Sequence, residues 1–364
     1  MNDDTVGETG GFADRLVAWQ KRHGRHGLPW QEDWRRLRDP YRIWLSEIML
    51  QQTQVATVIP FYHRFTERFP RLADLAAAEA DDVMPFWSGL GYYARARNLH
   101  RCARVLAAQH GGAFPRDPAA LAALPGIGRS TANAIAAACF GTRVPILDGN
   151  VKRVLTRHFG IEGFPGTPAV ERRLWALADS LVPARSVAAW HQAQMDLGAT
   201  LCTRTRPRCA DCPVAGTCIA LRDGRIGDLP TPRGRRPTPE RETTVLVVLV
   251  DGRVLLERRP PAGIWGGLLS LPELAEGEDP ASRLAALGLD LLEAAELPPL
   301  PHAFTHFRLL LRPLLCHARA RTAVREEGHI WLPAAELAGA ALPAPVRRIL
   351  MELPATRTAT WGGH

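Results

Sequence analysis

The spacing of apolar residues changes once along the chain, and this change separates two regions. Through about the first 220 residues, apolar side chains recur at i, i+3 and i+4, the period of an amphipathic helix. Glycine and proline residues separate the segments that carry this pattern. We predict helices at 12–22, 41–50, 53–69, 74–86, 92–110, 118–124, 129–140, 149–158, 168–182 and 186–201.

After residue 229 the composition changes. Residues 230–240 hold four prolines and three arginines and few apolar side chains, which is typical of a linker. The β-branched run at 243–250 ends at Asp251-Gly252, a dipeptide that favours a tight hairpin, and a second apolar run follows at 253–257. Further elements are predicted as a second strand pair at 303–315 and 329–332, with helices at 280–287, 334–339 and 343–352.

These elements predict a mainly α N-terminal region joined by a linker to an α+β C-terminal domain. The predicted parts are a helical domain at 12–229, a linker at 230–241, a C-terminal domain at 242–354, and disordered tails at 1–11 and 355–364. Within the helical domain we expect a six-helix subdomain at about 39–145 and a second subdomain formed by the N-terminal helix and 146–229.

Charge is distributed unevenly between these regions. Residues 1–241 contain 33 basic and 23 acidic residues, a balance of +10, whereas residues 242–364 contain 12 and 14, a balance of −2. The helical region is therefore expected to bind a polyanion. No run of 18 or more apolar residues occurs, and residues 1–11 are acidic. We expect neither a signal peptide nor a membrane span, and hence a cytoplasmic protein.

Four of the seven cysteines lie within seventeen residues, while the other three are isolated on apolar backgrounds. The four are Cys202, Cys209, Cys212 and Cys218. Four thiolates at this spacing can surround one centre, and both zinc and a [4Fe–4S] cluster accept four cysteines. The basic residues Arg204, Arg206 and Arg208 lie between the first two ligands. A loop held by such a centre could present these arginines to phosphates.

A glycine hairpin at 124–128 separates two of the predicted helices. Gly126 and Gly128 flank one apolar residue, so the backbone can turn sharply and leave N–H groups unpaired where helix 129–140 begins. Such N–H groups suit a phosphate, and the turn is also a candidate site for a monovalent or divalent cation. An ordinary corner between two helices is the alternative interpretation.

Two carboxyl groups lie in positions that suit acid–base chemistry. Glu47 lies in the apolar end of helix 41–50, where burial would keep it protonated at neutral pH, as a general acid requires. Asp148 lies at the start of helix 149–158. A pair of carboxyls in different environments is what glycosidic-bond cleavage uses. The alternatives are a solvent-facing glutamate and a simple N-cap.

The segment Gly89-Leu90-Gly91-Tyr92-Tyr93 forms a glycine-rich corner before a basic helix. Apolar and aromatic side chains on such a corner could insert between stacked bases. Packing of the tyrosines in the protein core is the alternative.

In combination, these motifs resemble the adenine DNA glycosylases of the MutY type, within the endonuclease III-like helix–hairpin–helix superfamily. The matching segments are LPW (28–30), SEIMLQQTQV (46–55), WSGLGYYARARNLH (87–100), LPGIGRST (124–131), PILDGNVKRV (145–154), MDLGATLC (195–202) and RRPPAGIWGGLLSLP (258–272). The cysteine spacing is similar to that of the family's iron–sulfur loop. The resemblance therefore implies a [4Fe–4S] cluster in place of zinc, and no nucleotide cofactor.

The resemblance implies excision of adenine mispaired with 8-oxoguanine or guanine in double-stranded DNA, after the adenine nucleotide is flipped out of the duplex. Glu47 matches the general acid that protonates adenine at N7, Asp148 the carboxylate that stabilises the cationic sugar, and Asn150 a residue that orients the water or the sugar. Further matches are Leu28, Trp30, Ser130 and Asp196 at the adenine pocket, and Gln52, Leu90 and Tyr92 around the opposite lesion.

Ser130 indicates how far the reaction proceeds. Bifunctional relatives carry a lysine here that forms a Schiff base with the sugar, which a serine cannot do. The resemblance therefore implies a monofunctional enzyme that leaves an abasic site. Lys152 lies one turn beyond Asp148, and we interpret any adduct at this lysine as a side reaction.

The C-terminal domain resembles the Nudix-like domain of these enzymes. The glutamate-rich helix of a true Nudix hydrolase is missing between Gly263 and Leu300, so we expect a domain that recognises the lesion without hydrolysing nucleotides. Phe304, Thr305 and His306 match the loop that recognises 8-oxoguanine, with threonine where serine is more usual. Gly267 matches a glycine that allows the backbone to approach DNA.

Three alternatives remain at this point. Ser130 and the C-terminal domain argue against a bifunctional glycosylase/lyase acting on oxidised pyrimidines. The presence of both Glu47 and Asp148 argues against a non-catalytic iron–sulfur protein that binds lesions. The missing Nudix helix argues against a nucleotide pyrophosphatase. The expected partners are duplex DNA and proteins that process abasic sites, and we expect a monomer associated with the nucleoid of a bacterium.

Overall fold

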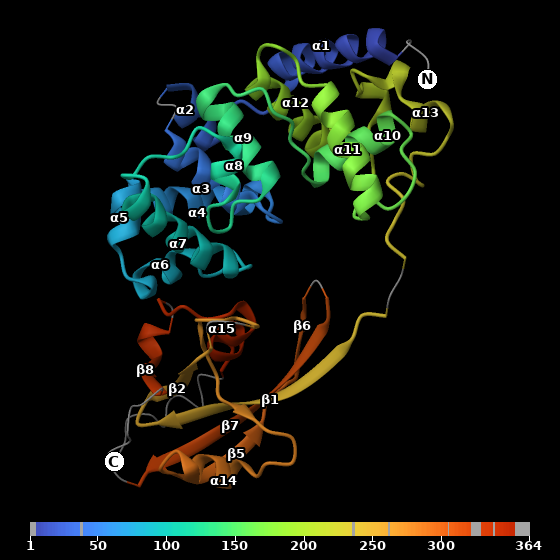
Figure 1. The fold of residues 1–364 in the computed structure, drawn as a ribbon. Coiled ribbons are helices and arrows are strands. Elements are labelled where there is room, and N and C mark those ends of the chain that lie inside the picture. Colours follow the sequence, from blue (N-terminus) through green and yellow to red (C-terminus); the bar gives the residue numbers. More distant parts are fainter. Residues whose placement is uncertain are drawn as a thin grey trace. The chain divides into compact units, whose positions relative to one another are not determined.

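The computed structural model describes residues 5–36, 39–234, 237–260, 263–304, 306–321, 329–337 and 339–353 (Figure 1). It divides into two compact units. The helical unit comprises Met1–Ala78 and Asn98–Arg235, and the C-terminal unit comprises Glu79–Arg97 and Arg236–His364. Among the described residues, no helix is both long and apolar enough to cross a membrane.

The helices of the N-terminal region follow the predicted order. They are α1 (Thr5–His23), α2 (Pro29–Arg36), α3 (Pro40–Leu50), α4 (Val55–Arg68), α5 (Leu72–Ala77), α6 (Ala80–Trp87), α7 (Ala94–Gln109), α8 (Pro118–Ala122), α9 (Arg129–Phe140), α10 (Gly149–His158), α11 (Pro168–Ser180), α12 (Val187–Thr200) and α13 (Ile219–Arg222). Two short 3₁₀ helices lie at Cys209–Asp211 and Ala215–Thr217.

Two predictions in this region differ from the structure. The tail at 1–11 was predicted to be disordered, but α1 already begins at Thr5 and packs along α12. The single helix predicted at 74–86 is two helices, because the backbone at Ala78 is extended and ends α5. The predicted helices at 129–140 and 149–158 have the observed bounds.

Helix α9 lies at the centre of the helical unit and contacts α3, α8 and α12. Its sequence is rich in alanine, and small side chains allow the neighbouring helices to approach closely. Gly141 ends the helix with φ of 72°, a left-handed conformation that glycine adopts without strain. One face of α9 joins an apolar core formed with α1, α10, α11 and α12.

The C-terminal unit is built on a mixed sheet. Its strands are β1 (Glu240–Val250), β2 (Arg253–Arg258), β3 (Leu269–Ser270), β4 (Glu273–Leu274), β5 (Leu289–Glu296), β6 (Leu300–Ala303), β7 (Arg308–Ala320) and β8 (His329–Pro333). The main order is β3-β2-β1-β7-β5, with β1 and β7 parallel. The remaining elements are α14 (Pro280–Ala286), α15 (Ala344–Met351) and a 3₁₀ helix at Ala334–Glu336.

The predicted hairpin at Asp251-Gly252 joins β1 to β2, with φ of 45° and 74° at these two residues. The second predicted strand pair is wrong. β8 pairs with β2, and β7 pairs with β1, β5 and β6. Alternation of side chains shows that both ends of 303–332 are strands, but it carries no information about which strands become neighbours.

The continuous apolar run in β1 reflects burial on both faces of the sheet. Val245, Val247 and Leu249 face a core shared with α15, whereas Leu246 and Val248 face a core shared with α14. The two helices thus cover opposite faces (Figure 1). A strand buried on both faces is expected to be apolar throughout, as the sequence shows.

The sequence predicts that residues 79–97 belong to the helical domain, but they form one compact unit with the C-terminal strands. The Ser88 hydroxyl donates to the Leu342 carbonyl over 3.2 Å, and Arg258 pairs with Asp81 over 2.9 Å. These contacts join segments more than 170 residues apart in the sequence, which local patterns do not reveal. The predicted tail at 355–364 lies outside the described residues.

Candidate functional site

Glu47 lies near the C-terminal end of α3. Asp39 is the N-cap of this helix, and its carboxylate accepts a hydrogen bond from the Tyr41 N–H over 3.0 Å. Pro40 occupies the first helical position. Glu47 is largely buried, between the fully buried residues Ser46 and Ile48. Burial raises the pKa of Glu47 to about 7, and the negative charge of Asp148 acts in the same direction. A large fraction of this carboxyl is therefore protonated at neutral pH.

Asp148 is the N-cap of α10. Its carboxylate accepts hydrogen bonds from the Val151 N–H over 2.8 Å and from Asn150 Nδ2 over 3.3 Å. Burial raises the pKa of Asp148, while these donors and the positive charge of Arg153 oppose the rise. The two carboxyls thus differ in environment: hydrogen bonds stabilise the charged form of Asp148, whereas burial and a neighbouring charge both favour the neutral form of Glu47.

A chain of hydrogen bonds leads from Asp148 to the cysteine loop. Arg153 donates to Asn150 Oδ1 over 2.8 Å and to the Cys202 carbonyl over 2.7 Å. Asn150 in turn donates to Asp148. A Cβ at Gly198 would lie 2.6 Å from the Asn150 Cβ, so glycine is needed for α12 to pack this closely on α10. The sequence predicted a role for Asn150 in the site but none for Arg153. Arg153 lies one helical turn beyond Gly149.

The segment that precedes Asp148 is held from α9 and α12. Ser130 Oγ accepts a hydrogen bond from the Leu147 N–H over 3.0 Å, and Asn133 Nδ2 donates to the Pro145 carbonyl over 2.7 Å. The His191 imidazole lies 2.8 Å from the Val144 carbonyl. The Ser130 hydroxyl therefore helps to hold the backbone before Asp148. Its place at the adenine pocket stays a prediction.

The hairpin at 124–128 has the sharp turn that its glycines predict. Gly126 has φ of 78°, and a Cβ there would lie 2.7 Å from the Asn98 Cβ. Leu124 and Ile127 are buried and fix the turn to the core. Gly128 is the N-cap of α9 and has no side chain to satisfy the first N–H groups of the helix. These groups lack intrahelical acceptors and suit an anion.

Asp196 is fully buried, and its cationic partner, Arg25, lies in the connector before α2. It accepts hydrogen bonds from Arg25 Nε over 2.7 Å and from the Arg25 N–H over 3.0 Å, and Gln192 Nε2 donates over 2.8 Å. Leu28 and Trp30 are buried just beyond this connector, and the Trp30 ring packs edge-on against Tyr62. Sequence reasoning missed Arg25, although a buried carboxylate requires a cationic partner.

The four clustered cysteines line one common cavity beside α13. No three His, Cys, Asp or Glu side chains in the described ranges converge closely enough to hold a single metal ion. Arg157, which sequence reasoning missed, donates to Cys202 Sγ over 3.5 Å and to the Thr203 carbonyl over 2.7 Å. It fixes the start of the loop.

The three predicted phosphate-binding arginines of this loop are exposed. Arg208 lies 3.7 Å from Asp211, which offsets part of its charge. The Arg204 carbonyl accepts a hydrogen bond from Arg157 over 3.1 Å, so its backbone is held while its side chain reaches solvent. Arg204 and Arg206 are therefore better placed than Arg208 to bind phosphates.

The three residues predicted around the lesion differ in exposure. Gln52 is exposed in a turn after α3, with φ of 56°. Tyr92 is 46% exposed with φ of 50°, and the Arg95 guanidinium lies 5.3 Å from the centre of its ring. Leu90, by contrast, is buried. Tyr92 is thus available for insertion, whereas Leu90 would have to leave its packed position first.

The predicted recognition residues of the C-terminal unit lie on two turns. Gly267 has φ of 77°, and the space beyond it is open apart from the Arg97 side chain at 3.8 Å. The Phe304 and Phe307 rings are stacked with centroids 4.4 Å apart, and His306 is exposed. Thr305 lies outside the described residues. Trp265 packs near Phe304 and also has positive φ, which the sequence did not indicate.

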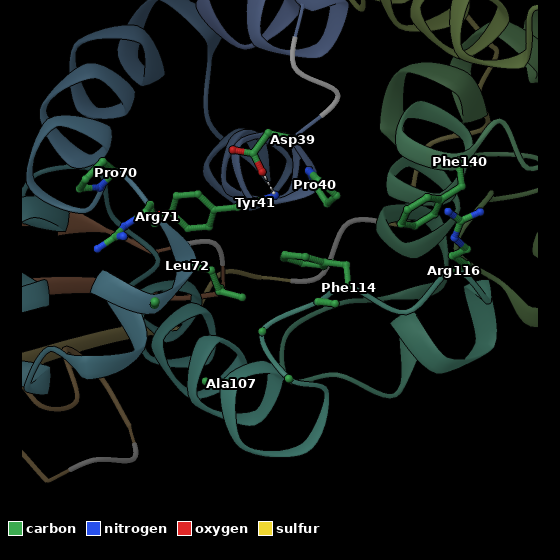
Figure 2. Close-up of a pocket in the computed structure, with 14 residues that line it drawn as sticks. Asp39, Pro40, Tyr41, Pro70, Arg71, Leu72, Ala107, Phe114, Arg116 and Phe140 are labelled. Carbon is green, nitrogen blue, oxygen red and sulfur yellow. Dashed lines mark hydrogen bonds between the residues drawn. The ribbon is translucent and has the colours of Figure 1, made fainter.

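A separate cavity of about 770 Å³ lies at the N-terminal end of α3 (Figure 2). Its walls include the rings of Tyr41, Phe114 and Phe140, with Arg116 beside Phe140. None of the site residues predicted from the sequence lines this cavity. It therefore carries no part of the chemistry described above.

Both regions match known protein families. Residues 45–180 match the HhH-GPD superfamily of base excision DNA repair proteins, and residues 244–352 match the NUDIX domain. The adenine DNA glycosylase of Buchnera aphidicola subsp. Acyrthosiphon pisum (strain APS) is 33% identical over 341 residues, which cover 93% of this chain and 96% of that protein. The chain belongs to the adenine DNA glycosylase family.

The adenine DNA glycosylase of Mus musculus is also 33% identical, over 94% of this chain and 78% of its own. Among solved structures, a thermostable thymine-DNA glycosylase is similar, with a TM-score of 0.55 and 28% identity, covering 61% of this chain and 100% of that one. These findings confirm the predicted fold class and the predicted enzyme class, a DNA glycosylase.

Proposed function

We propose that this adenine DNA glycosylase family member removes adenine mispaired with 8-oxoguanine or guanine in duplex DNA, by hydrolysing the N-glycosidic bond. The pair of carboxyls, Glu47 and Asp148, carries the proposal. Burial raises the pKa of Glu47 to about 7, while hydrogen bonds stabilise the carboxylate of Asp148. Burial raises the pKa of both carboxyls, but the hydrogen bonds to Asp148 and the charge of Arg153 oppose the rise at Asp148. The two environments therefore suit a proton donor at Glu47 and a charge-stabilising group at Asp148.

The two carboxyls have complementary roles in the proposed reaction. Glu47 gives its proton to N7 of the flipped adenine, so the base leaves as a neutral molecule. Asp148 stabilises the positive charge that develops on the sugar as the bond to adenine breaks. Asn150 donates to Asp148 and keeps its carboxylate oriented. A water molecule then adds at C1′ and completes the hydrolysis.

We further propose that the enzyme is monofunctional. Ser130 stands where lyase relatives carry a lysine, and its hydroxyl binds the Leu147 N–H. A hydroxyl cannot form an imine with the sugar aldehyde. The product is therefore an abasic site in an unbroken strand, and it requires further proteins for repair.

The four cysteines are proposed to hold a [4Fe–4S] cluster. The residues fit this group, because all four cysteines line one cavity and a [4Fe–4S] cluster takes four cysteine ligands. When bound, the cluster supplies four iron–thiolate bonds that hold the loop from Cys202 to Cys218. The chain's own contribution is to present Arg204 and Arg206 to DNA phosphates, with Arg157 fixing the start of the loop.

Recognition of the base opposite adenine is proposed to involve the C-terminal unit. Phe304, Thr305 and His306 would contact 8-oxoguanine, and Gly267 would allow close approach of the backbone. Tyr92 belongs to the same compact unit and is exposed, which supports a role as a wedge between bases. We expect the protein to act as a monomer.

The test is single-turnover cleavage of a duplex containing adenine opposite 8-oxoguanine, analysed with and without alkali. We expect strand breaks at adenine only after alkali, because alkali cleaves the abasic product. A duplex with cytosine opposite 8-oxoguanine is the control and should stay intact. Strand breaks without alkali, or activity on thymine glycol but not adenine, would instead identify a bifunctional enzyme for oxidised pyrimidines.

A further inference from the structure

The chain contains 43 arginines but only two lysines, Lys21 and Lys152. A lysine amine can attack the aldehyde of an abasic sugar, whereas an arginine does not. Lys152 lies on α10, where its N–H donates to the Asp148 carbonyl over 2.9 Å. This backbone bond places the residue Lys152 one helical turn beyond Asp148, whose carboxylate is proposed to be catalytic.

The Lys152 amine is held by a partner on the next helix. Its Nζ lies 2.7 Å from Glu171 Oε1, and the two side chains are 24% and 41% exposed. Glu171 occupies the first turn of α11, which packs on α10. Val170 and Leu174 face the apolar core, which fixes the rotation of α11 and leaves Glu171 beside Lys152.

We propose that Glu171 holds Lys152 in this ion pair and thereby keeps a latent strand-cleaving activity low; the proposal rests on the proposed function, whose product is an abasic site. In the latent reaction, neutral Nζ attacks C1′ of the ring-opened aldehyde, forms an imine and releases water. A water molecule then takes a C2′ proton, the C–H electron pair forms the C2′–C3′ double bond, and the 3′ phosphate leaves, which breaks the strand. Hydrolysis of the imine returns the amine.

The ion pair opposes the first step of this reaction. Before it can attack, Nζ must leave the Glu171 carboxylate and lose a proton. A partly exposed ion pair has a modest energy, so the expected suppression is about two- to fivefold. Glu171 is thus a positioning residue, which acts through Lys152 and does not touch the DNA.

The experiment uses the full-length protein, a duplex with a ready-made abasic site, and sodium borohydride. Borohydride reduces the imine to a secondary amine and leaves a covalent protein–DNA complex that a denaturing gel resolves. We expect Glu171→Gln to increase trapping by about two- to fivefold. The increase should be absent in the double variant Glu171→Gln with Lys152→Arg, and it should persist when Lys21→Arg is added to Glu171→Gln.

Glu162→Gln is the matched control. It removes an ion pair of similar length, 2.8 Å to Arg225, in the same unit but without a lysine. This variant should trap as the wild type does. Glu171→Gln should leave the rate of adenine excision unchanged, and thermal unfolding should show that both variants fold.

Two results would overturn the proposal: no increase with Glu171→Gln, or an increase that persists when Lys152 is also replaced. Because the abasic site is made beforehand, trapping is independent of which base the enzyme removes. Failure of adenine excision by the wild type would refute the proposed function without changing the comparison between variants.

Discussion

The region around Asp148 and the turns of the C-terminal unit hold their side chains in different ways. Before Asp148, side chains of neighbouring helices bind the backbone, as in the Ser130 contact to Leu147 and the Asn133 contact to Pro145. In the C-terminal unit, the shape of the exposed turns depends on residues with left-handed backbone conformations. Tyr92, Trp265 and Gly267 have φ of 50°, 55° and 77°.

The difference matches what each region is proposed to do. Acid–base chemistry depends on charges and hydrogen bonds at short range, and packed helices keep these distances constant. A side chain that inserts between bases, or a loop that recognises a damaged base, must instead project from the protein surface. A residue with positive φ in a tight turn achieves this at a cost of about 1–3 kcal/mol in backbone strain.

The turns of the C-terminal unit are nevertheless anchored. The Tyr93 hydroxyl lies 3.4 Å from the Leu342 carbonyl, and Arg347 donates to Ser88 Oγ over 3.1 Å. Arg97 donates to the Gly266 carbonyl and so joins the turn near Tyr92 to the turn that holds Gly267. Strained conformations persist only where such contacts surround them.

The largest expected effect comes from Glu47. Glu47→Gln removes the transferable proton, so the single-turnover rate of adenine release should fall by about 10²- to 10⁴-fold. Binding of the mispaired duplex should remain, because the fold and the arginines are unchanged. Glu67→Gln, which alters an exposed glutamate on α4, is the control and should have no effect. A near wild-type rate in Glu47→Gln would contradict the assignment of the acid.

The dependence of the rate on pH is the second prediction. The pKa of Glu47 is raised to about 7, and only the protonated form donates. The single-turnover rate should therefore be highest below pH 7 and fall by about tenfold per pH unit well above it. Rates measured from pH 5 to 9 on one duplex would test this. A rate that rises through pH 7 would mean that Glu47 acts as a base.

The smallest effect is expected for the C-terminal turns. Gly267→Ala and Gly277→Ala both place a side chain at φ near 77°, which destabilises the fold by about 1–2 kcal/mol. Both variants should therefore unfold at slightly lower temperature. Only Gly267→Ala should also reduce the preference for adenine opposite 8-oxoguanine over adenine opposite guanine, by a few-fold. Equal preferences in the two variants would show that the turn at Gly267 does not contact DNA.

Local patterns in the sequence were sufficient to predict many of the helices and turns of the fold. Periodicity and glycine breaks predicted α9 and α10 with their observed bounds, and Asp251-Gly252 predicted the β1–β2 turn. Asp148 is also the N-cap of α10, which its position at a helix start offered as the alternative interpretation. Each of these features depends on interactions within a few residues, so a short window of sequence contains their cause.

Features that depend on distant contacts were not predicted. α1 packs along α12, and residues 79–97 form one compact unit with the C-terminal strands through bonds such as Ser88 to Leu342. Arg25, Arg153 and Arg157 looked like surface charges in a basic chain. Only the fold shows that they bind Asp196, Asn150 and the cysteine loop.

The order of amino acids alone supplies the reactive groups: two carboxyls at helix ends, four clustered cysteines, a glycine hairpin, and a serine where a lysine would change the reaction. What these groups can do depends on how the chain folds. Burial beside Asp148 raises the pKa of Glu47, and the approach of α11 to α10 brings Glu171 to Lys152. The physical reason is that a residue's identity sets its ordinary chemistry, whereas desolvation and neighbouring charges arise only when distant segments pack together.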